Sequence, residues 1–163
     1  RRYGEVARMA QRASGNTLLD LYCGAGTIGL SMAAACGQLV GVEIVAEAVE
    51  NARANAARMG AQNVRILCAD AASAAQQLLA EGLRPDVGVL DPPRKGCDEA
   101  TLSAVATMAP RRVVMVSCNA ATAARDAAWL AAHGYAPQAV RPVDMFPRTR
   151  HVETVVLMSR VDK

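Results

Sequence analysis

The stretch that decides the fold of this chain is Asp20-Leu21-Tyr22-Cys23-Gly24-Ala25-Gly26-Thr27-Ile28-Gly29. It follows the short apolar run Thr17-Leu18-Leu19 and opens an alanine-rich segment, so it predicts a strand, a tight glycine turn and the start of a helix. Glycines let the backbone bend sharply and approach a ligand, and the free N–H groups of a helix start face that ligand. The stretch therefore predicts a binding site for a nucleotide-like molecule.

The composition is typical of one globular domain. The chain has 163 residues, of which 52% are hydrophobic and 20% charged. A chain of this length buries roughly 70% of its unfolded surface, which is enough for one substantial core. No apolar run approaches the ~18 residues of a membrane helix, so we expect a cytoplasmic protein, a monomer, with no membrane partner. The first residue is not Met, which predicts a fragment of a longer chain.

Charge and cysteine content narrow the possible functions further. A net charge of +3 is compatible with a nucleic-acid partner but does not demonstrate one. The five cysteines contain no Cys-x-x-Cys pair, so their spacing favours neither a zinc site nor a disulfide framework. We therefore expect no metal.

The rest of the chain alternates short apolar runs with helical segments. The patterns predict strands at 17–19, 38–43, 64–68, 87–90, 112–117, 139–145 and 152–158, and helices at 3–13, 28–36, 46–59, 72–81, 99–108 and 122–133. This alternation predicts an α/β fold with a mainly parallel seven-stranded sheet, covered on both faces and closed by an antiparallel C-terminal hairpin.

Each of the first five predicted strands ends at a reactive side chain. Ligands of parallel sheets collect beyond the carboxyl ends of the strands, so five such residues at five strand ends predict a single site there. In chain order they are Asp20, Glu43, Asp70, Asp91 and Cys118.

Two ligands fit the glycine turn. Its three glycines match the dinucleotide fingerprint, with Glu43 placed to hold a ribose. A dinucleotide gives no role to Asp20 or Asp70, whereas S-adenosylmethionine offers an ammonium group, a ribose diol for Glu43 and an adenine amino group for Asp70. A carboxylate at Asp20 repels a pyrophosphate and attracts an ammonium group. S-adenosylmethionine is therefore the better fit.

Four motifs are distributed between residues 20 and 153: DLYCGAGTIGL at 20–30, LDPPRKG at 90–96, VSCN at 116–119 and DMFPRTRHVE at 144–153. Together they resemble the catalytic domain of the RNA uridine-C5 methyltransferases, which act on ribosomal and transfer RNA. The first motif is general among methyltransferases, and the last three in this order are specific. The resemblance implies a Rossmann-like class I S-adenosylmethionine-dependent methyltransferase fold.

The resemblance also implies roles for individual residues. Cys118 is expected to be the nucleophile and Glu153 the base. A thiolate that adds to carbon 6 of uracil converts the ring into an enolate able to take a methyl group at carbon 5, and a carboxylate then removes the carbon-5 proton. The residues expected around the methyl donor are Tyr22, Gly24, Gly26, Thr27, Glu43, Asp70 and Asp91.

Other interpretations remain open. Cys97 is a rival nucleophile just after the Pro-Pro turn. Methylation of RNA cytosine at carbon 5 uses similar sulfur chemistry, and a fragment that binds RNA or the donor without turnover is a third possibility. The chain lacks the N-terminal RNA-binding regions of the family and an upstream motif with a donor-binding glutamine, and Ala120 stands where the family has proline. We therefore expect residues 1–163 to be the catalytic domain alone.

The expected partner is an RNA, ribosomal RNA more than transfer RNA. Its target base must leave the stack to react. Phe146 is a candidate for stacking on a base. The candidates for contacts with phosphates are Arg94, Lys95, Arg125, Arg141, Arg148 and Arg150.

Overall fold

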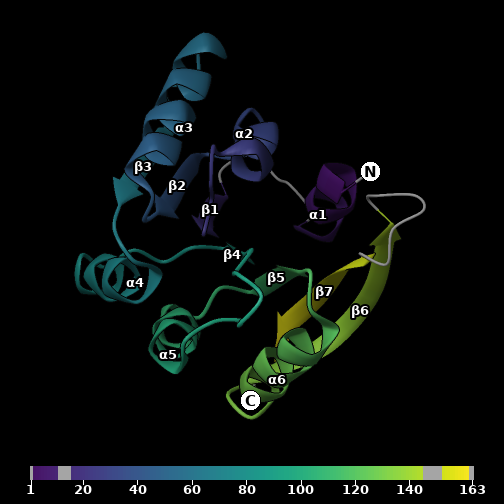
Figure 1. Ribbon diagram of the computed structural model, residues 1–163. Helices are drawn as coiled ribbons and strands as arrows, with labels where there is room; N and C mark the ends of the chain where they lie inside the picture. Colours follow the sequence, from purple (N-terminus) through teal and green to yellow (C-terminus); the bar gives the residue numbers. More distant parts are fainter. Residues whose placement is uncertain (1, 11–15, 145–151, 162–163) are drawn as a thin grey trace.

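A computed structural model describes residues 2–10, 16–144 and 152–161 as a central sheet with helices on both faces (Figure 1). The helices are α1 (Arg2–Ala10), α2 (Thr27–Ala33), α3 (Ala46–Arg58), α4 (Ala71–Ala80), α5 (Glu99–Met108) and α6 (Ala120–Ala131). The strands are β1 (Thr17–Leu21), β2 (Gln38–Glu43), β3 (Val64–Cys68), β4 (Val87–Leu90), β5 (Arg112–Ser117), β6 (Tyr135–Asp144) and β7 (Val152–Arg160).

The seven strands lie in the order β3-β2-β1-β4-β5-β7-β6. Strands β1 to β5 are parallel, and β7 runs antiparallel to both β5 and β6. The predicted parallel sheet with an antiparallel hairpin is confirmed. The strand order reverses between β1 and β4, so the crevice beyond their carboxyl ends is a topological switch point, where ligands of such sheets bind.

Alternating side chains along the strands build a core on each face of the sheet. Leu19 and Leu21 of β1 pack with side chains of α4, α5 and α6. Leu18, which precedes Leu19 and faces the opposite side of the sheet, packs with side chains of α1, α2 and α3. Figure 1 shows the same division, with α1 to α3 on one side of the sheet and α4 to α6 on the other. Because β1 to β5 are parallel, their carboxyl ends lie together at one side of the sheet, between the two helix layers.

Helix α6 begins at Ala120, two residues before the predicted start. The side chain of Asn119 accepts hydrogen bonds from the backbone N–H groups of Ala121 (3.0 Å) and Thr122 (3.4 Å). This N-cap satisfies donors that otherwise lack a partner at a helix start. The helix therefore starts directly after Cys118-Asn119.

Strand β6 begins at Tyr135, four residues before the predicted start. Its register against β7 shifts between Pro137 and Ala139. Proline has no N–H to donate, and it is tolerated here because β6 is the edge strand. The predicted strand end at Met145 lies outside the described residues.

Within the described ranges, no helix has both the length and the apolar character needed to cross a membrane.

Candidate functional site

The glycine turn after β1 has three backbone positions in the left-handed region. Tyr22, Gly24 and Gly26 have φ values of 61°, 56° and 83°. This conformation costs an L-residue roughly 1–2 kcal/mol, which is why two of the three are glycine. The backbone N–H of Cys23 donates to the carbonyl of Val42 at 2.9 Å and fixes the turn beside β2. This hydrogen bond and the two glycines fix the backbone of the turn, and Tyr22 has a strained backbone conformation within it.

Asp20 supports this turn from behind. It is 1% exposed, and its Oδ2 accepts a hydrogen bond from the backbone N–H of Gly29 at 3.1 Å. A Cβ on Gly29 would lie 2.7 Å from that oxygen, so a side chain there would displace the carboxylate. Asp20 thus joins the end of β1 to the first turn of α2.

Glu43, at the end of β2, holds two neighbouring loops. Its Oε1 accepts from the backbone N–H of Gly24 at 3.1 Å, and its Oε2 accepts from the backbone N–H of Val45 at 2.8 Å. A carboxylate has about four acceptor positions, and these two bonds use half of them. Glu43 keeps acceptor capacity for a ligand while its orientation is fixed.

Asp70 is the N-cap of α4. Its side chain accepts from the backbone N–H of Ser73 at 3.0 Å. Hydrogen bonds from Ser73 lower the pKa of this carboxyl group, because they favour its charged form. The side chain is therefore an ionised acceptor at neutral pH.

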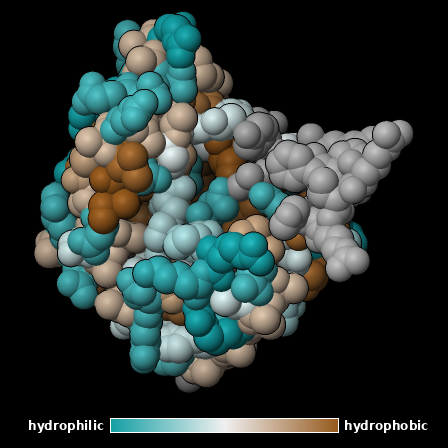
Figure 2. All heavy atoms as spheres, in the orientation of Figure 1, coloured by the Kyte–Doolittle hydropathy of each residue, from teal (hydrophilic) through white to brown (hydrophobic). Residues whose placement is uncertain are grey.

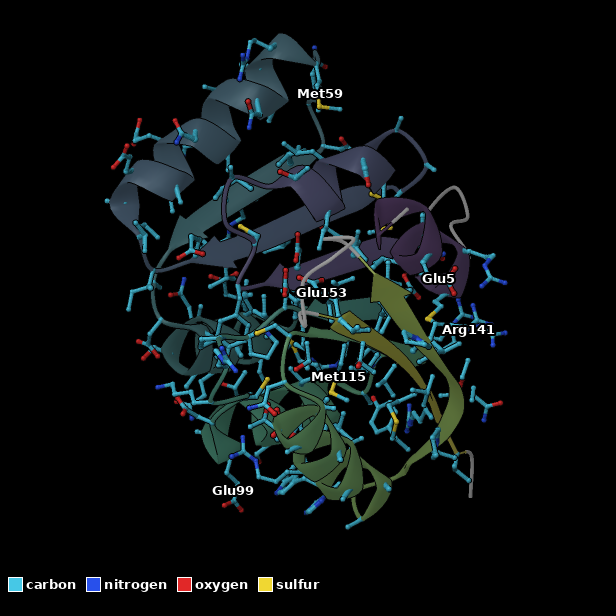
Figure 3. The ribbon with its side chains drawn as sticks, turned by 45° about the vertical axis from the view of Figure 1, so that its right-hand side comes forward. Glu5, Met59, Glu99, Met115, Arg141 and Glu153 are labelled. Carbon is cyan, nitrogen blue, oxygen red and sulfur yellow. The ribbon has the colours of Figure 1, made fainter. Side chains whose placement is uncertain are left out.

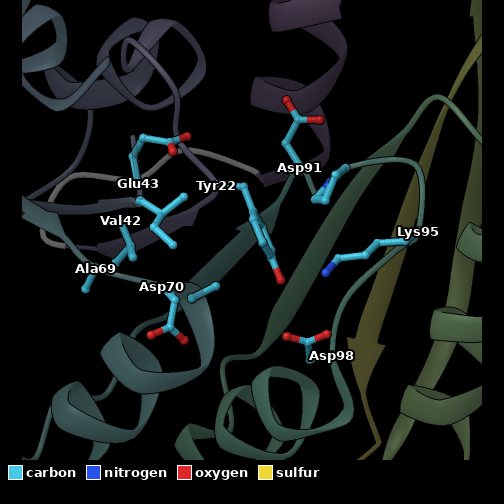
Figure 4. A pocket seen from close by; sticks show the side chains of 11 residues that line it. Tyr22, Val42, Glu43, Ala69, Asp70, Asp91, Lys95 and Asp98 are labelled. Carbon is cyan, nitrogen blue, oxygen red and sulfur yellow. The ribbon is translucent and has the colours of Figure 1, made fainter. Parts of the chain in front are cut away.

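These elements enclose a cavity of about 400 Å³, called here the strand-end pocket (Figure 4). Its size is in the range of small-molecule sites, roughly 300–1,000 Å³. Figure 2 shows the surface hollowed near the middle of the view, with hydrophilic side chains below the hollow. The residues that line the pocket are Tyr22, Val42, Glu43, Ile44, Ala69, Asp70, Ala71, Asp91, Pro93, Lys95 and Asp98.

The strand-end pocket brings together four of the residues expected around the donor: Tyr22, Glu43, Asp70 and Asp91. Gly24 is joined to them through its hydrogen bond to Glu43. Thr27, in contrast, is exposed at the start of α2 and lines a different hollow between α2 and α3.

Gly26 is buried inside the turn rather than in the pocket wall. A Cβ at this position would lie 3.0 Å from Leu30 Cδ1. Its contribution is to the shape of the turn.

The segment 91–98, called here the 91–98 loop, supplies pocket residues that the sequence patterns did not predict. Lys95 was expected to contact phosphate, yet it lines the pocket with Asp98 (Figure 4). Asp98 stands at the N-cap position of α5, and Ile44 directly follows Glu43. An aspartate directly before a predicted helix was the available signal for Asp98.

Tyr22 connects the pocket to the core beneath it. Burial raises the pKa of its phenol, and its hydroxyl interacts with the side chains of Thr101 and Cys97. The phenol therefore stays protonated at neutral pH. Its ring lies against the pocket (Figure 4).

The register of the sheet brings Cys118 and Glu153 to neighbouring positions. Ser117, the last residue of β5, pairs with Thr154 of β7 in an antiparallel ladder, so Cys118 and Glu153 each lie one residue beyond this pair, at the same end of the ladder. Cys118 is exposed and Glu153 half-buried, and Figure 3 shows Glu153 in the middle of the molecule rather than at its outer edge.

Cys97 is a poor rival for the nucleophile. It is 7% exposed, and burial, followed by the nearby charge of Asp126, raises the pKa of its thiol to about 12. Since the thiolate is the reactive form, a thiol that stays protonated at neutral pH reacts slowly.

Two of the expected phosphate contacts also have protein partners. Arg125 donates to the carbonyl oxygen of Lys95 at 2.7 Å and pairs with Asp126. Arg141 lies 3.8 Å from Glu5, as Figure 3 shows at the edge of the molecule. Arg148, Arg150 and Phe146 lie outside the described residues.

No group of three or more His, Cys, Asp or Glu side chains suited to a metal ion occurs within 2–10, 16–144 and 152–161.

Comparison with known proteins gives relatives along the whole chain. The chain is 48% identical over 161 residues to an "uncharacterized RNA methyltransferase" of Bacillus cereus, covering 99% of this chain and 35% of that protein. Among solved structures, it is similar to the tRNA (uracil-54, C5)-methyltransferase of Pyrococcus abyssi in complex with S-adenosyl-L-homocysteine, with a TM-score of 0.78 and 27% identity over 95% of this chain and 37% of that one. The chain thus spans about a third of the length of these relatives.

A more distant structure shows how general the fold is. The precorrin-6y C5,15-methyltransferase of Geobacter metallireducens is 15% identical with a TM-score of 0.80, and the match covers 97% of this chain and 87% of that one. A family model described as tRNA (uracil-5-)-methyltransferase matches residues 4–161. This chain therefore has the class I S-adenosylmethionine-dependent methyltransferase fold and belongs to the tRNA (uracil-5-)-methyltransferase family.

Proposed function

We propose that residues 1–163 are a catalytic domain that methylates carbon 5 of a uridine in RNA, with S-adenosylmethionine as the donor. The observation that carries this proposal is the β5–β7 register, in which Cys118 and Glu153 follow the pair Ser117 and Thr154. A thiol and a carboxylate at adjacent positions are the two groups that this reaction needs.

The chemistry of the strand-end pocket suits this donor. Three carboxylates, from Glu43, Asp70 and Asp91, line it. S-adenosylmethionine is a cation that supplies an electrophilic methyl group when it is bound. Glu43 has acceptor positions left for a ribose diol, and ionised Asp70 is an acceptor for the adenine amino group. An anionic pyrophosphate is repelled by the same carboxylates.

Cys118 is well placed to begin the reaction. It is exposed and lies directly before Asn119, the N-cap of the twelve-residue helix α6. The positive end of a helix dipole stabilises a thiolate. The sulfur forms a bond to carbon 6 of the uracil, and the electron pair of the C5–C6 double bond moves into the enolate. Carbon 5 then forms the new bond to the methyl group as the bond between that methyl group and the donor's sulfur breaks, which leaves S-adenosylhomocysteine.

Glu153 completes the reaction as the base. Its carboxylate removes the proton from carbon 5, and the electrons of that C–H bond re-form the C5–C6 double bond. The bond between sulfur and carbon 6 breaks, and Cys118 leaves as a thiolate. The products are the methylated base and a carboxyl group that releases its proton to solvent.

The choice of RNA belongs to the same proposal. Ribosomal RNA is the expected substrate, and the Pyrococcus abyssi relative is a tRNA methyltransferase. Both classes of RNA are therefore tested side by side. Digestion to nucleosides distinguishes 5-methyluridine from 5-methylcytidine and so separates the uridine reaction from the cytosine alternative.

The decisive experiment uses RNA that carries 5-fluorouridine. Fluorine does not leave as a proton, so a covalent adduct accumulates on Cys118, mapped by mass spectrometry. Cys118→Ala abolishes the adduct, whereas Cys36→Ala, at the end of α2, keeps it. An adduct that survives Cys118→Ala overturns the assignment of the nucleophile. Donor binding without methylation of any RNA overturns the proposed activity in favour of a binding-only domain.

A further inference from the structure

The 91–98 loop is fixed to one face of helix α6. Near the start of the helix, Nδ2 of Asn119 and Oγ1 of Thr122 both donate to the carbonyl oxygen of Arg94, at 3.3 Å and 3.0 Å. Asn119, Thr122 and Asp126 are spaced by three and four residues, so they lie on the same side of the helix.

One turn further along α6, two charged side chains continue the attachment. Nη2 of Arg125 donates to the carbonyl oxygen of Lys95 at 2.7 Å. Oδ2 of Asp126 accepts from the backbone N–H of Cys97 at 2.8 Å, and its Oδ1 accepts from Nε and Nη2 of Arg125 at 3.2 Å and 3.1 Å. Asp126 therefore binds the loop directly and also orients the arginine that binds the preceding part of the loop.

Asp126 is a charged side chain in a closely packed place. It is 2% exposed. Between the two attached loop residues lies Gly96, where a Cβ would come within 2.3 Å of Arg125 Nη2 and 2.8 Å of Asp126 Oδ2. A buried charge is tolerated only when hydrogen bonds and an opposite charge satisfy it. The structure supplies both, which indicates that the carboxylate has a specific task here.

The loop and the helix each carry a part of the site. Four residues of the 91–98 loop line the strand-end pocket: Asp91, Pro93, Lys95 and Asp98. The helix begins at Ala120, two residues after Cys118. Whatever holds the loop on the helix therefore also sets the distance between the pocket and the nucleophile.

We propose that Asp126 is a positioning residue for methyl transfer: it holds the 91–98 loop on α6, so that the wall of the strand-end pocket and Cys118 move as one unit. This inference rests on the proposed function. It predicts that the loss of Asp126 weakens donor-site binding and slows the reaction of Cys118 together, although Asp126 lines neither the pocket nor the surface around the cysteine.

The test compares Asp126→Asn and Asp126→Ala with a matched pair at Asp86. Asp86 also accepts from a backbone N–H, that of Thr17 at 2.7 Å, and lies 3.7 Å from an arginine, Arg111. It lies directly before β4, at the amino-terminal ends of the parallel strands, whereas the pocket lies beyond their carboxyl ends. The Asp86 side chain is 34% exposed, against 3% for that of Asp126, so Asp86→Asn and Asp86→Ala report what the loss of a hydrogen-bonded but less buried carboxylate away from the pocket does by itself.

Three measurements are made well below the unfolding temperature of each variant. They are the affinity for S-adenosylhomocysteine by calorimetry, the rate of adduct formation with 5-fluorouridine RNA, and hydrogen exchange at the amide of Cys97. We expect both Asp126 variants to bind S-adenosylhomocysteine about tenfold more weakly and to form the adduct about tenfold more slowly, with faster exchange at Cys97. The Asp86 variants stay within about twofold of the unsubstituted chain.

Two results overturn the inference. One is an Asp126→Asn chain with unchanged affinity and adduct rate, and the other is an equal loss in the Asp86 variants. Failure of the proposed function gives a different result, because then the unsubstituted chain itself forms no adduct. In that case the affinity for S-adenosylhomocysteine and the exchange at Cys97 still decide whether Asp126 holds the pocket wall.

Discussion

Gly96→Ala tests the attachment of the 91–98 loop from the other side. Gly96 has a φ of 82°, and a Cβ there would lie 2.3 Å from Arg125 Nη2 and 2.8 Å from Asp126 Oδ2. The end of the Arg125 side chain can move away, but it then loses its hydrogen bond to the carbonyl oxygen of Lys95. The buried Asp126 has less freedom to move, because it also binds the amide of Cys97.

The expected loss of stability has two parts. The left-handed backbone costs an alanine roughly 1–2 kcal/mol. Loss of one hydrogen bond that involves a charged group costs about 1.5–3 kcal/mol more. We therefore expect Gly96→Ala to lower the free energy of unfolding by about 2.5–5 kcal/mol.

Gly82→Ala is the matched control. Gly82 has nearly the same φ, 85°, but nothing lies within 4 Å of the position of its Cβ. It carries the backbone cost alone, so the difference between the two variants isolates the contacts with Arg125 and Asp126. Urea denaturation measures both, and a difference of about 2 kcal/mol corresponds to a gap of roughly 4–8 °C in Tm. Equal losses in the two variants would refute this account of the loop.

Three other predictions concern the thiols and the pocket. Iodoacetamide at neutral pH is expected to label exposed Cys118 well before Cys97 and Cys23, because burial raises the pKa of both of those thiols to about 12. Peptide mass mapping of the native chain measures the order of labelling. Rapid labelling of Cys97 in the native chain would contradict this prediction. The Cys23 and Cys97 thiols keep their protons in the folded state up to a pKa of about 12, whereas in the unfolded chain they lose them from a pKa of 9.0 upward. The free energy of unfolding is therefore expected to fall as the pH rises from about 9 to about 12. Urea titrations across that range measure it, and the absence of a decline would contradict the prediction. Asp70→Asn keeps an equally good N-cap, so stability changes by less than about 0.5 kcal/mol, while the calorimetric affinity for S-adenosylhomocysteine drops; an unchanged affinity removes Asp70 from the binding site.

Much of the fold was predictable because its local signals agree with its tertiary structure. The strands at 64–68, 87–90 and 112–117 have the predicted bounds, since each is a short apolar run between residues that end or cap neighbouring elements. The start of β6 was missed: the predicted strand begins at Ala139, after Pro137, although it already contains Pro142. Only the position of β6 at the sheet edge, which is a property of the whole topology, makes that proline acceptable.

The candidate site was predictable where it depends on strand ends. Glu43, Asp70 and Asp91 follow from the rule that parallel strands end at one edge, and they meet in the strand-end pocket. Thr27 was expected beside the donor but does not line the pocket, because the first residue of α2, one position past the turn, lines the separate hollow between α2 and α3. Asp126 was missed altogether, since an aspartate within a helix has no distinguishing local pattern, and its partners lie about thirty residues away in the sequence.

The position of β7 between β5 and β6 has a consequence for the order in which activity arises during synthesis. The ribosome makes the N-terminal part first, and domains fold as their residues emerge. Strands β1 to β5 and the strand-end pocket are complete in the sequence before β7 has been made. We expect a nascent chain to acquire its small-molecule site early and its base last, when the final strand inserts beside β5. In the proposed mechanism Glu153 of β7 is the group that lets Cys118 release the RNA, so we expect a chain that ends before β7 to hold its RNA as a covalent adduct.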